Sequence, residues 1–160
     1  MKAILIGGSG LIGSSLLSEL LKSDQITDIL LVARKASGIS DPKIRELILN
    51  FDDLDTHTEK FKADIIFSCL GTTRNKTPDE TLYRKIDLEY PLKMLEIAIS
   101  NGIKQFHIVT SLGADAYSSN SYLRLKGELE NRLNSLDLPS LHLYQPSFLR
   151  GESQEKTPAQ

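Results

Sequence analysis

The stretch Ile4-Leu5-Ile6-Gly7-Gly8-Ser9-Gly10-Leu11-Ile12-Gly13 decides the fold of this chain. A short apolar run leads into glycines spaced G-x-x-G-x-x-G, and apolar residues then recur at helical spacing. A strand, a glycine turn and a helix in this order are typical of a dinucleotide-binding turn. We expect Gly7 to permit the tight turn, Gly10 to let the backbone approach a pyrophosphate, and Gly13 to let helix and strand pack closely. Free N–H groups at a helix start point at phosphates, so the predicted site also includes Ser9, Leu11 and Ile12.

The rest of the chain repeats the pattern of a short apolar run, a turn and a longer helical period. Apolar runs lie at residues 3–6, 29–32, 47–49, 65–70, 106–109 and 141–144, and helical patterns lie at 11–21, 82–99 and 121–133. Near-continuous apolar runs indicate strands buried on both faces, and their alternation with helices indicates parallel order. The sequence therefore predicts an α/β fold, a Rossmann-type doubly wound parallel sheet, whose ligands lie beyond the carboxyl ends of the strands.

The composition is that of an ordinary globular domain, with 40% apolar and 25% charged residues among 160 and a formal charge of −2. We expect one domain over residues 1–151 and a polar, disordered tail over residues 152–160. The charge gives no basic footprint for nucleic acid, and no apolar run is long enough for a signal peptide or a membrane span. Cys69 is the sole cysteine and the histidines are dispersed, so we expect no metal site and a reducing, cytoplasmic location.

A basic pair follows the second predicted strand. About twenty residues after a glycine turn, an NAD-specific site usually carries an acidic residue for the ribose 2′-hydroxyl. This chain has Arg34 and Lys35 there. A guanidinium suits a 2′-phosphate through paired hydrogen bonds, whereas a carboxylate would repel it. We therefore expect NADP(H) in preference to NAD(H), the alternative being that the pair is a solvated turn.

Two further turns lie at the same predicted edge of the sheet. Asp52, with Asp53 beside it, follows the third apolar run and is placed to accept a hydrogen bond from the adenine amino group, although loops are commonly acidic. Leu70, Gly71 and Thr72 end the fourth run, where a glycine lets the backbone pass close to the cofactor ribose.

A tyrosine and a lysine lie four residues apart in the last predicted helix. This spacing places Tyr122 and Lys126 on one helix face. A fixed cation favours the phenolate and can bring the pKa of the tyrosine towards a useful range, and the lysine could also bond the nicotinamide ribose. Ser111 ends the fifth run, where its hydroxyl could polarise a substrate carbonyl while Tyr122 exchanges the proton. On an arbitrary helix Y-x-x-x-K is ordinary surface, so its weight comes from this position in the sheet.

Three longer stretches carry a resemblance to a known family. They are residues 69–74 (Cys-Leu-Gly-Thr-Thr-Arg), 109–115 (Val-Thr-Ser-Leu-Gly-Ala-Asp) and 122–128 (Tyr-Leu-Arg-Leu-Lys-Gly-Glu). With the glycine turn, they make the chain resemble the short-chain dehydrogenase/reductase superfamily, and within it the atypical branch of Tat-interacting-protein-like NAD(P)H-binding oxidoreductases. The resemblance implies NADP(H) bound along residues 7–13 and at Arg34, with Pro146 and Phe148 near the nicotinamide. It also implies Ser111, Tyr122 and Lys126 as the acid–base set.

The resemblance leaves three hypotheses for function. The first is an oxidoreductase that transfers hydride between NADP(H) and a small carbonyl or alcohol substrate, with Tyr122 as acid/base. The second is a regulatory or redox-sensing module that binds NADP(H) without turnover, because relatives continue beyond the sixth strand with a segment that shapes the substrate pocket. The third is a nucleoside-diphosphate-sugar epimerase-like protein, which needs a sizeable substrate lobe. Gln145 also stands before Pro146, where relatives usually carry arginine.

The identity of the substrate and the oligomeric state are left open by the sequence. The apolar stripe of the long helix from residue 82 is consistent with a homodimer or a protein partner, and core packing explains the same stripe equally well.

Overall fold

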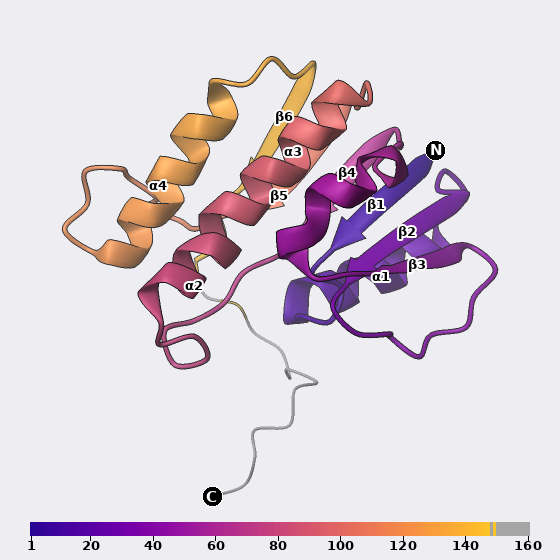
Figure 1. Ribbon diagram of the computed structural model, residues 1–160, viewed down its shortest axis with the longest axis horizontal. Coiled ribbons are helices and arrows are strands. Elements are labelled where there is room, and N and C mark those ends of the chain that lie inside the picture. Colours follow the sequence, from indigo (N-terminus) through magenta and orange to yellow (C-terminus); the bar gives the residue numbers. More distant parts are fainter. Residues whose placement is uncertain (148, 150–160) are drawn as a thin grey trace, which may run out of the picture.

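Within the described residues, six strands form one parallel sheet. They are β1 (Lys2–Ile6), β2 (Asp28–Ala33), β3 (Ile44–Ile48), β4 (Ile65–Ser68), β5 (Gln105–Val109) and β6 (Ser140–Tyr144). The computed structural model describes residues 1–147 and 149, so Phe148 and the predicted tail over residues 152–160 lie outside the described residues. The strand order is β3-β2-β1-β4-β5-β6 (Figure 1). The predicted Rossmann-type sheet is confirmed, with its topological switch point between β1 and β4.

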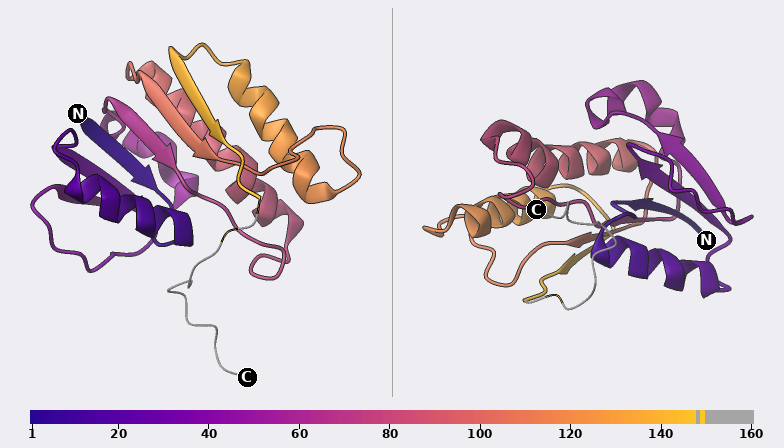
Figure 2. Two further views of the ribbon diagram at one scale, coloured as in Figure 1. Left: turned by 180° about the vertical axis from the view of Figure 1, so that it is seen from behind. Right: turned by 90° about the horizontal axis from the view of Figure 1, so that it is seen from below.

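Helices cover the two faces of the sheet unequally. They are α1 (Leu11–Lys22), η1 (Phe51–Lys60), α2 (Glu80–Arg84), η2 (Lys85–Glu89), α3 (Tyr90–Ser100) and α4 (Ser121–Asn134). Figure 2 shows α1 on one face of the sheet and η1, α3 and α4 on the other. Each face has its own apolar core. Leu17 of α1 packs in one core with Leu5, and Met94 of α3 packs in the other with Ile4 and Phe106.

The burial of the strands follows from this unequal cover. In β1, β2 and β4 nearly every residue is buried, as the continuous apolar runs predict. The prediction of two buried faces is wrong for β3, β5 and β6. β3 is the edge strand and begins at Ile44 rather than at residue 47. The core beside α1 is built from β1, β2 and β4, so one side of β5 and β6 has less cover within the described part of the chain.

The helix predicted over residues 82–99 is confirmed as a continuous helical run over residues 80–100, made of α2, η2 and α3. The middle segment, η2, is a π-helix, after which the Tyr90 N–H donates to the carbonyl of Lys85, five residues earlier. Pro91 explains this wide turn, because it has no N–H to donate to the carbonyl of Asp87 and its ring crowds that carbonyl. The segment buries Asp87 at 1% exposure, and this carboxylate becomes important at the candidate site.

A 3-10 helix, η1, replaces the acidic loop predicted after the third strand. The side chain of Asn50 accepts a hydrogen bond from the Asp52 N–H at 3.2 Å and so caps the start of this helix. Phe51 and Leu54 are buried in the same core as Met94 of α3. The two apolar residues three positions apart, after an asparagine cap, were the sequence signal for this helix.

A row of rings crosses the less covered side of β4, β5 and β6. The parallel register places Phe67, His107 and His142 side by side. The two imidazoles stack with 4.1 Å between their centroids, and His107 Nδ1 lies 2.9 Å from the Tyr144 hydroxyl oxygen. Burial, and then the charge of His142, lower the pKa of His107 from 6.5 to about 4. The folded protein therefore holds the His107 imidazole neutral down to an acidic pH.

We expect His107 to make the protein less stable as the pH falls from 6.5 to about 4. In this window the unfolded chain binds a proton at His107 that the folded chain does not, so the free energy of unfolding falls with pH. Because the ring is partly exposed, we expect a loss of about 1–2 kcal/mol. Urea unfolding at a series of pH values measures it. His107→Gln should flatten the slope in this window, and an unchanged slope in His107→Gln would contradict the prediction.

Candidate functional site

The carboxyl ends of the parallel strands lie along one edge of the sheet, and the candidate residues follow them there. Residues 7–13 follow β1, Arg34 follows β2, Asp52 follows β3, residues 70–72 follow β4, Ser111 follows β5 and Pro146 follows β6. This edge is where doubly wound sheets bind their ligands. The sequence therefore predicted the common location of these residues, and the structure shows how each of them is held.

The glycine turn is packed so tightly that side chains do not fit at two of its positions. Gly7 has a φ of +80°, and a Cβ there would lie 2.6 Å from the carbonyl of Cys69. A Cβ on Gly13 would overlap the carbonyl oxygen of Gly7. Gly10 is different, because its nearest neighbour would lie 3.4 Å away. Gly7 and Gly13 thus shape the turn itself, whereas Gly10 is less closely packed and is consistent with the predicted approach of a pyrophosphate.

The start of α1 presents backbone donors to this space. Gly10 precedes the helix and supplies no side-chain cap, and the first turn of α1 contains no acidic residue. The N–H groups of the first helical turn, at Leu11, Ile12 and Gly13, have no intrahelical acceptor. The helix dipole adds partial positive charge at the same end, so the backbone here fits the phosphates of a dinucleotide.

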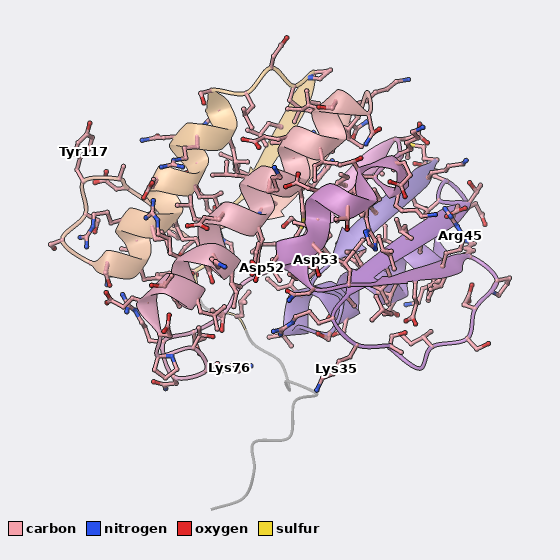
Figure 3. The ribbon with its side chains drawn as sticks, in the orientation of Figure 1. Lys35, Arg45, Asp52, Asp53, Lys76 and Tyr117 are labelled. Atoms are coloured by element: carbon pink, nitrogen blue, oxygen red, sulfur yellow. The ribbon has the colours of Figure 1, made fainter. Side chains whose placement is uncertain are left out.

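The two basic residues after β2 differ in their surroundings. Both Arg34 and Lys35 are exposed, and Lys35 extends away from the sheet into solvent (Figure 3). The charge of Arg34 acts on the phenol of Tyr90, where it opposes the larger effects of burial and of Asp52, which raise the pKa of that tyrosine to about 12. The charge of Arg34 therefore acts on Tyr90, which is the hydrogen-bond partner of Asp52 in η1.

Asp52 is held by two side chains rather than being a free loop residue. Lys85 Nζ lies 3.0 Å from Asp52 Oδ1, and the Tyr90 hydroxyl donates to the same oxygen at 2.9 Å. These hydrogen bonds, the one from Lys85 above all, lower the pKa of Asp52. Asp53 is exposed beside it (Figure 3). The carboxylate of Asp52 thus stays charged and remains an acceptor, as its predicted contact with adenine requires.

The turn after β4 is fixed by a buried carboxylate. The Thr72 N–H donates to Asp87 Oδ2 at 2.9 Å, and the hydroxyls of Thr72 and Thr77 are hydrogen-bonded at 2.9 Å. A Cβ on Gly71 would meet only Asp87 Oδ1, at 3.6 Å, so the protein itself does not require glycine there. The open side of Gly71 is consistent with its predicted closeness to a bound ribose.

Lys126 is paired with an acid that the sequence analysis did not single out. Its Nζ lies 2.6 Å from Asp87 Oδ1, and the two side chains are 5% and 1% exposed. The contact is an ion pair without the alignment of a hydrogen bond. The same Nζ lies 5.9 Å from the centroid of the Tyr122 ring, as the four-residue spacing requires. Asp87 is therefore a further partner of Lys126, beside the predicted Tyr122.

Removing the acid of this pair should destabilise the protein strongly. Asp87→Ala leaves the ammonium of Lys126 buried without a counter-charge and frees the Thr72 amide, so we expect a loss of about 3–5 kcal/mol. Asp87→Asn can still accept from Thr72 and should cost less. Asp28→Asn, at the exposed pair of Asp28 with Arg45, should cost at most about 1 kcal/mol. Urea unfolding compares the three variants, and a loss below 1 kcal/mol for Asp87→Ala would contradict the prediction.

The loop that carries Ser111 is docked on α4, the helix of Tyr122 and Lys126. A Cβ on Gly127 would overlap the backbone of Asp115 and Ala116, so loop and helix touch at this glycine. The Asp115 N–H also donates to the carbonyl of Leu123 at 3.1 Å. Gly127 therefore lets the loop of Ser111 and the helix of Tyr122 touch. A glycine inside the predicted helix was the sequence signal for this contact.

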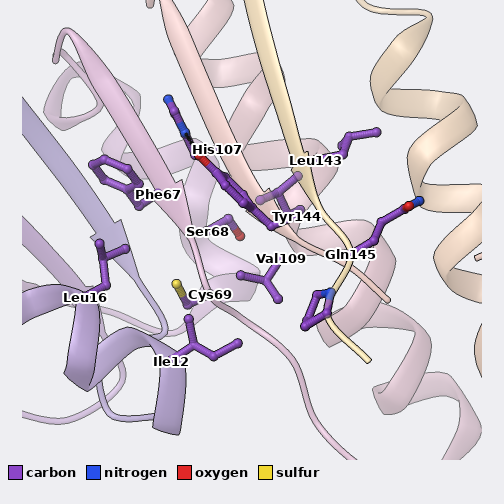
Figure 4. Close-up of a pocket in the computed structure, with 12 residues that line it drawn as sticks. Ile12, Leu16, Phe67, Ser68, Cys69, His107, Val109, Leu143, Tyr144 and Gln145 are labelled. Carbon is purple, nitrogen blue, oxygen red and sulfur yellow. Dashed lines mark hydrogen bonds between the residues drawn. The ribbon is translucent and has the colours of Figure 1, made fainter. Parts of the chain in front are cut away.

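A hollow of about 620 Å³ opens beside the glycine turn, on the α1 side of the sheet. Figure 4 shows Ile12 of α1, Cys69 after β4 and Val109 of β5 around it. Pro146 also lines it, and its carbonyl accepts from the Leu112 N–H at 3.0 Å. Pro146 and Ile12 of the predicted site therefore line the same hollow. Burial raises the pKa of the Cys69 thiol to about 11, which favours the neutral thiol.

Two further residues lie by the acid–base set and were not predicted. Tyr83 is buried, and burial, then the charges of Asp87 and Tyr122, raise its pKa to about 12. The guanidinium of Arg74 lies 4.9 Å above the Tyr83 ring and donates to Ser121 Oγ at 3.2 Å. Arg74 ends the stretch 69–74 that carries the resemblance, whereas Tyr83 had no positional signal in the sequence and is brought here by the packing of α2.

The family of the chain follows from its match over most of this architecture. Residues 3–132 match the NAD dependent epimerase/dehydratase family, a span that includes the glycine turn, Ser111, Tyr122 and Lys126. The chain belongs to this family. The chain therefore has the Rossmann-type fold of a family that is described as NAD dependent.

Two known proteins are similar to nearly the whole chain. Protein HTATIP2 of Rattus norvegicus is 32% identical over 160 residues, which cover 98% of this chain and 66% of that protein. "Protein FMP52, mitochondrial" of Meyerozyma guilliermondii is 32% identical over 154 residues, which cover 95% of this chain and 66% of that protein. The chain thus spans about two thirds of the length of these relatives. The predicted resemblance to Tat-interacting-protein-like oxidoreductases is confirmed.

A solved structure shares the fold. The oxidoreductase ylbE from Lactococcus lactis has a TM-score of 0.74 at 20% identity, over 91% of this chain and 68% of that protein.

No helix in the described part of the chain is long and apolar enough to cross a membrane. The name of the fungal relative FMP52 refers to mitochondria and lends no support to the predicted cytoplasmic location.

Proposed function

We propose that the chain is an NADP(H)-dependent oxidoreductase that transfers hydride to or from a small carbonyl or alcohol substrate, with Tyr122 as acid/base. The observation that carries this proposal is a tightly packed glycine turn on the same sheet edge as the ion-paired Lys126, whose Nζ faces the Tyr122 ring. The family match supports a dinucleotide in this turn.

The residues of the chain would hold the cofactor at three points. The N–H groups at the start of α1 bind the pyrophosphate, Arg34 pairs with the 2′-phosphate, and Asp52 accepts from the adenine amino group. When bound, the nicotinamide supplies hydride-transfer chemistry. Pro146 and Phe148 are the proposed neighbours of the nicotinamide, and Phe148 lies outside the described residues.

The proton is moved by Tyr122. In the reducing direction, Ser111 donates a hydrogen bond to the substrate carbonyl oxygen and the Tyr122 hydroxyl gives that oxygen its proton as the alcohol forms. In the oxidising direction, Tyr122 takes the proton from the alcohol. The ammonium of Lys126 favours the phenolate that remains after proton transfer, and Asp87 keeps that ammonium in place.

The cofactor preference is tested by titration of NADPH and NADH at equal, low ionic strength. Arg34→Ala removes a charge-assisted contact, so we expect NADPH affinity to fall about tenfold or more while NADH affinity changes less than about twofold. Lys35→Ala is the matched control and should have the smaller effect, because Lys35 extends into solvent. Comparable affinities of the unmodified chain for NADPH and NADH would overturn the preference for NADP(H).

A nucleoside-diphosphate-sugar epimerase-like activity is the second candidate, favoured by the family to which the chain belongs. Such an enzyme returns its cofactor to the starting redox state, so it gives a new sugar nucleotide without net change in absorbance at 340 nm. The oxidoreductase gives a stoichiometric change with a carbonyl or alcohol. Product analysis on both substrate panels distinguishes the two activities, and saturable NADPH binding without either product favours a regulatory module.

A further inference from the structure

Asp52, at the start of η1, is held in one orientation by two residues from the helical segment that crosses over it. We propose that Lys85 and Tyr90 clamp one carboxylate oxygen of Asp52 so that the other selects a purine base with an exocyclic amino group, adenine over hypoxanthine. Lys85 and Tyr90 are then positioning residues for the cofactor base. This inference rests on the proposed function, because it concerns the same dinucleotide.

Both contacts of the clamp are to the same oxygen. Lys85 Nζ and the Tyr90 hydroxyl lie 3.0 Å and 2.9 Å from Asp52 Oδ1. Among the described residues, the hydrogen bonds to this carboxylate use Oδ1 and leave Oδ2 open. The Asp52 side chain is 49% exposed, so a ligand at the sheet edge can reach that second oxygen.

Tyr90 and the backbone of Asp52 are themselves held in place. Tyr90 is 9% exposed, and its ring packs edge-on against Phe51 with 5.5 Å between centroids and 70° between planes. Asn50 accepts from the Asp52 N–H and so holds the backbone of the carboxylate. Because Phe51 adjoins Asp52, η1 and α3 restrain the carboxylate from both its backbone and its head group. An acceptor held in this way loses little conformational entropy when a base binds.

The hydrogen-bonding chemistry of Asp52 Oδ2 favours adenine over hypoxanthine. A charged carboxylate only accepts hydrogen bonds, and the hydrogen bonds of Asp52 keep its pKa low. The amino group of adenine donates to it, whereas the carbonyl of hypoxanthine at the same ring position presents a second acceptor and is repelled. Lys85 also offsets the negative charge of Asp52, which would otherwise disfavour a cofactor that carries several phosphates.

The test compares NADPH with reduced nicotinamide hypoxanthine dinucleotide phosphate, which differs from it only in the base. We expect the unmodified chain to bind NADPH about tenfold more tightly, the range of one hydrogen bond to a charged group. Asp52→Asn should bring the ratio of the two affinities close to one, because an amide can turn to donate to hypoxanthine. Tyr90→Phe and Lys85→Met should each lower the ratio at least about threefold, and Lys85→Arg should restore it.

Lys93→Met is the matched control. Lys93 of α3 forms an ion pair with Asp55 of η1, with its Nζ 2.8 Å from Asp55 Oδ1, and loss of this pair should leave the ratio unchanged. Thermal unfolding of each variant confirms that it is folded. Equal affinity of the unmodified chain for both dinucleotides overturns this inference alone, as does an unchanged ratio in both Tyr90→Phe and Lys85→Met. Binding of neither dinucleotide overturns the proposed function as well.

Discussion

Gly13→Ala is expected to lower NADPH affinity about 10- to 100-fold and to destabilise the chain. The new Cβ would overlap the Gly7 carbonyl oxygen and lie 2.9 Å from the Cα of Gly8, and these neighbours are backbone atoms that cannot rotate away. Overpacking of this kind costs about 1–3 kcal/mol, and each 1.4 kcal/mol is a factor of ten in affinity. Fluorescence titration of NADPH gives the affinity, and thermal unfolding gives the stability.

Gly10→Ala separates the loss of NADPH affinity from the loss of stability. Gly10 has a φ of −76° and its nearest neighbour would lie 3.4 Å from a Cβ, so alanine is compatible with the unliganded backbone. We expect the melting temperature of Gly10→Ala to stay close to that of the unmodified chain while NADPH affinity falls, because the methyl group occupies space proposed for the pyrophosphate. A Gly13→Ala variant that binds NADPH normally would show that this turn is not the cofactor site.

Tyr122→Phe is expected to lower the rate of hydride transfer about 10²- to 10⁴-fold, the range of a lost general acid or base. Phenylalanine keeps the half-buried ring against the core and removes only the hydroxyl. The fold and NADPH affinity should therefore be retained. The measurement is single-turnover change in absorbance at 340 nm with a carbonyl panel at saturating NADPH.

Two controls make this result specific to the phenol. Tyr117, on the loop before α4, is a residue that is 93% exposed, and Tyr117→Phe should leave the rate unchanged. Ser111→Ala should lower the rate while the fold is retained, because its hydroxyl polarises the carbonyl in the proposed reaction. An unchanged rate in Tyr122→Phe, with the unmodified chain active, would show that another group transfers the proton.

The sheet and its cofactor edge could be predicted from the sequence because local patterns specify them. Apolar runs that end in Gly7, Arg34 and Gly71 each mark the carboxyl end of a strand, and parallel order brings those ends to one edge. The four-residue spacing of Tyr122 and Lys126 likewise fixes their shared helix face. These features depend on neighbours in the sequence, so a single chain is enough to find them.

The partners of the site residues could not be predicted, because they come from distant elements. Asp87 reaches Lys126 from a π-helix that depends on Pro91, and nothing near Lys126 in the sequence points to it. Lys85 and Tyr90 reach Asp52 in the same way, across more than thirty positions. The less covered side of β5 and β6 was also missed, because the apolar run of each strand does not tell how far α1 extends over the sheet.

A two-dimensional NMR titration with NADPH shows through the backbone amide signals of the unmodified chain whether the glycine turn holds NADP(H). We expect saturable shifts at residues 7–13, 34 and 70–72, with smaller shifts on the sheet edge that carries Met1 and Gln25. Saturating NADPH that leaves the amides of residues 7–13 unshifted would contradict it.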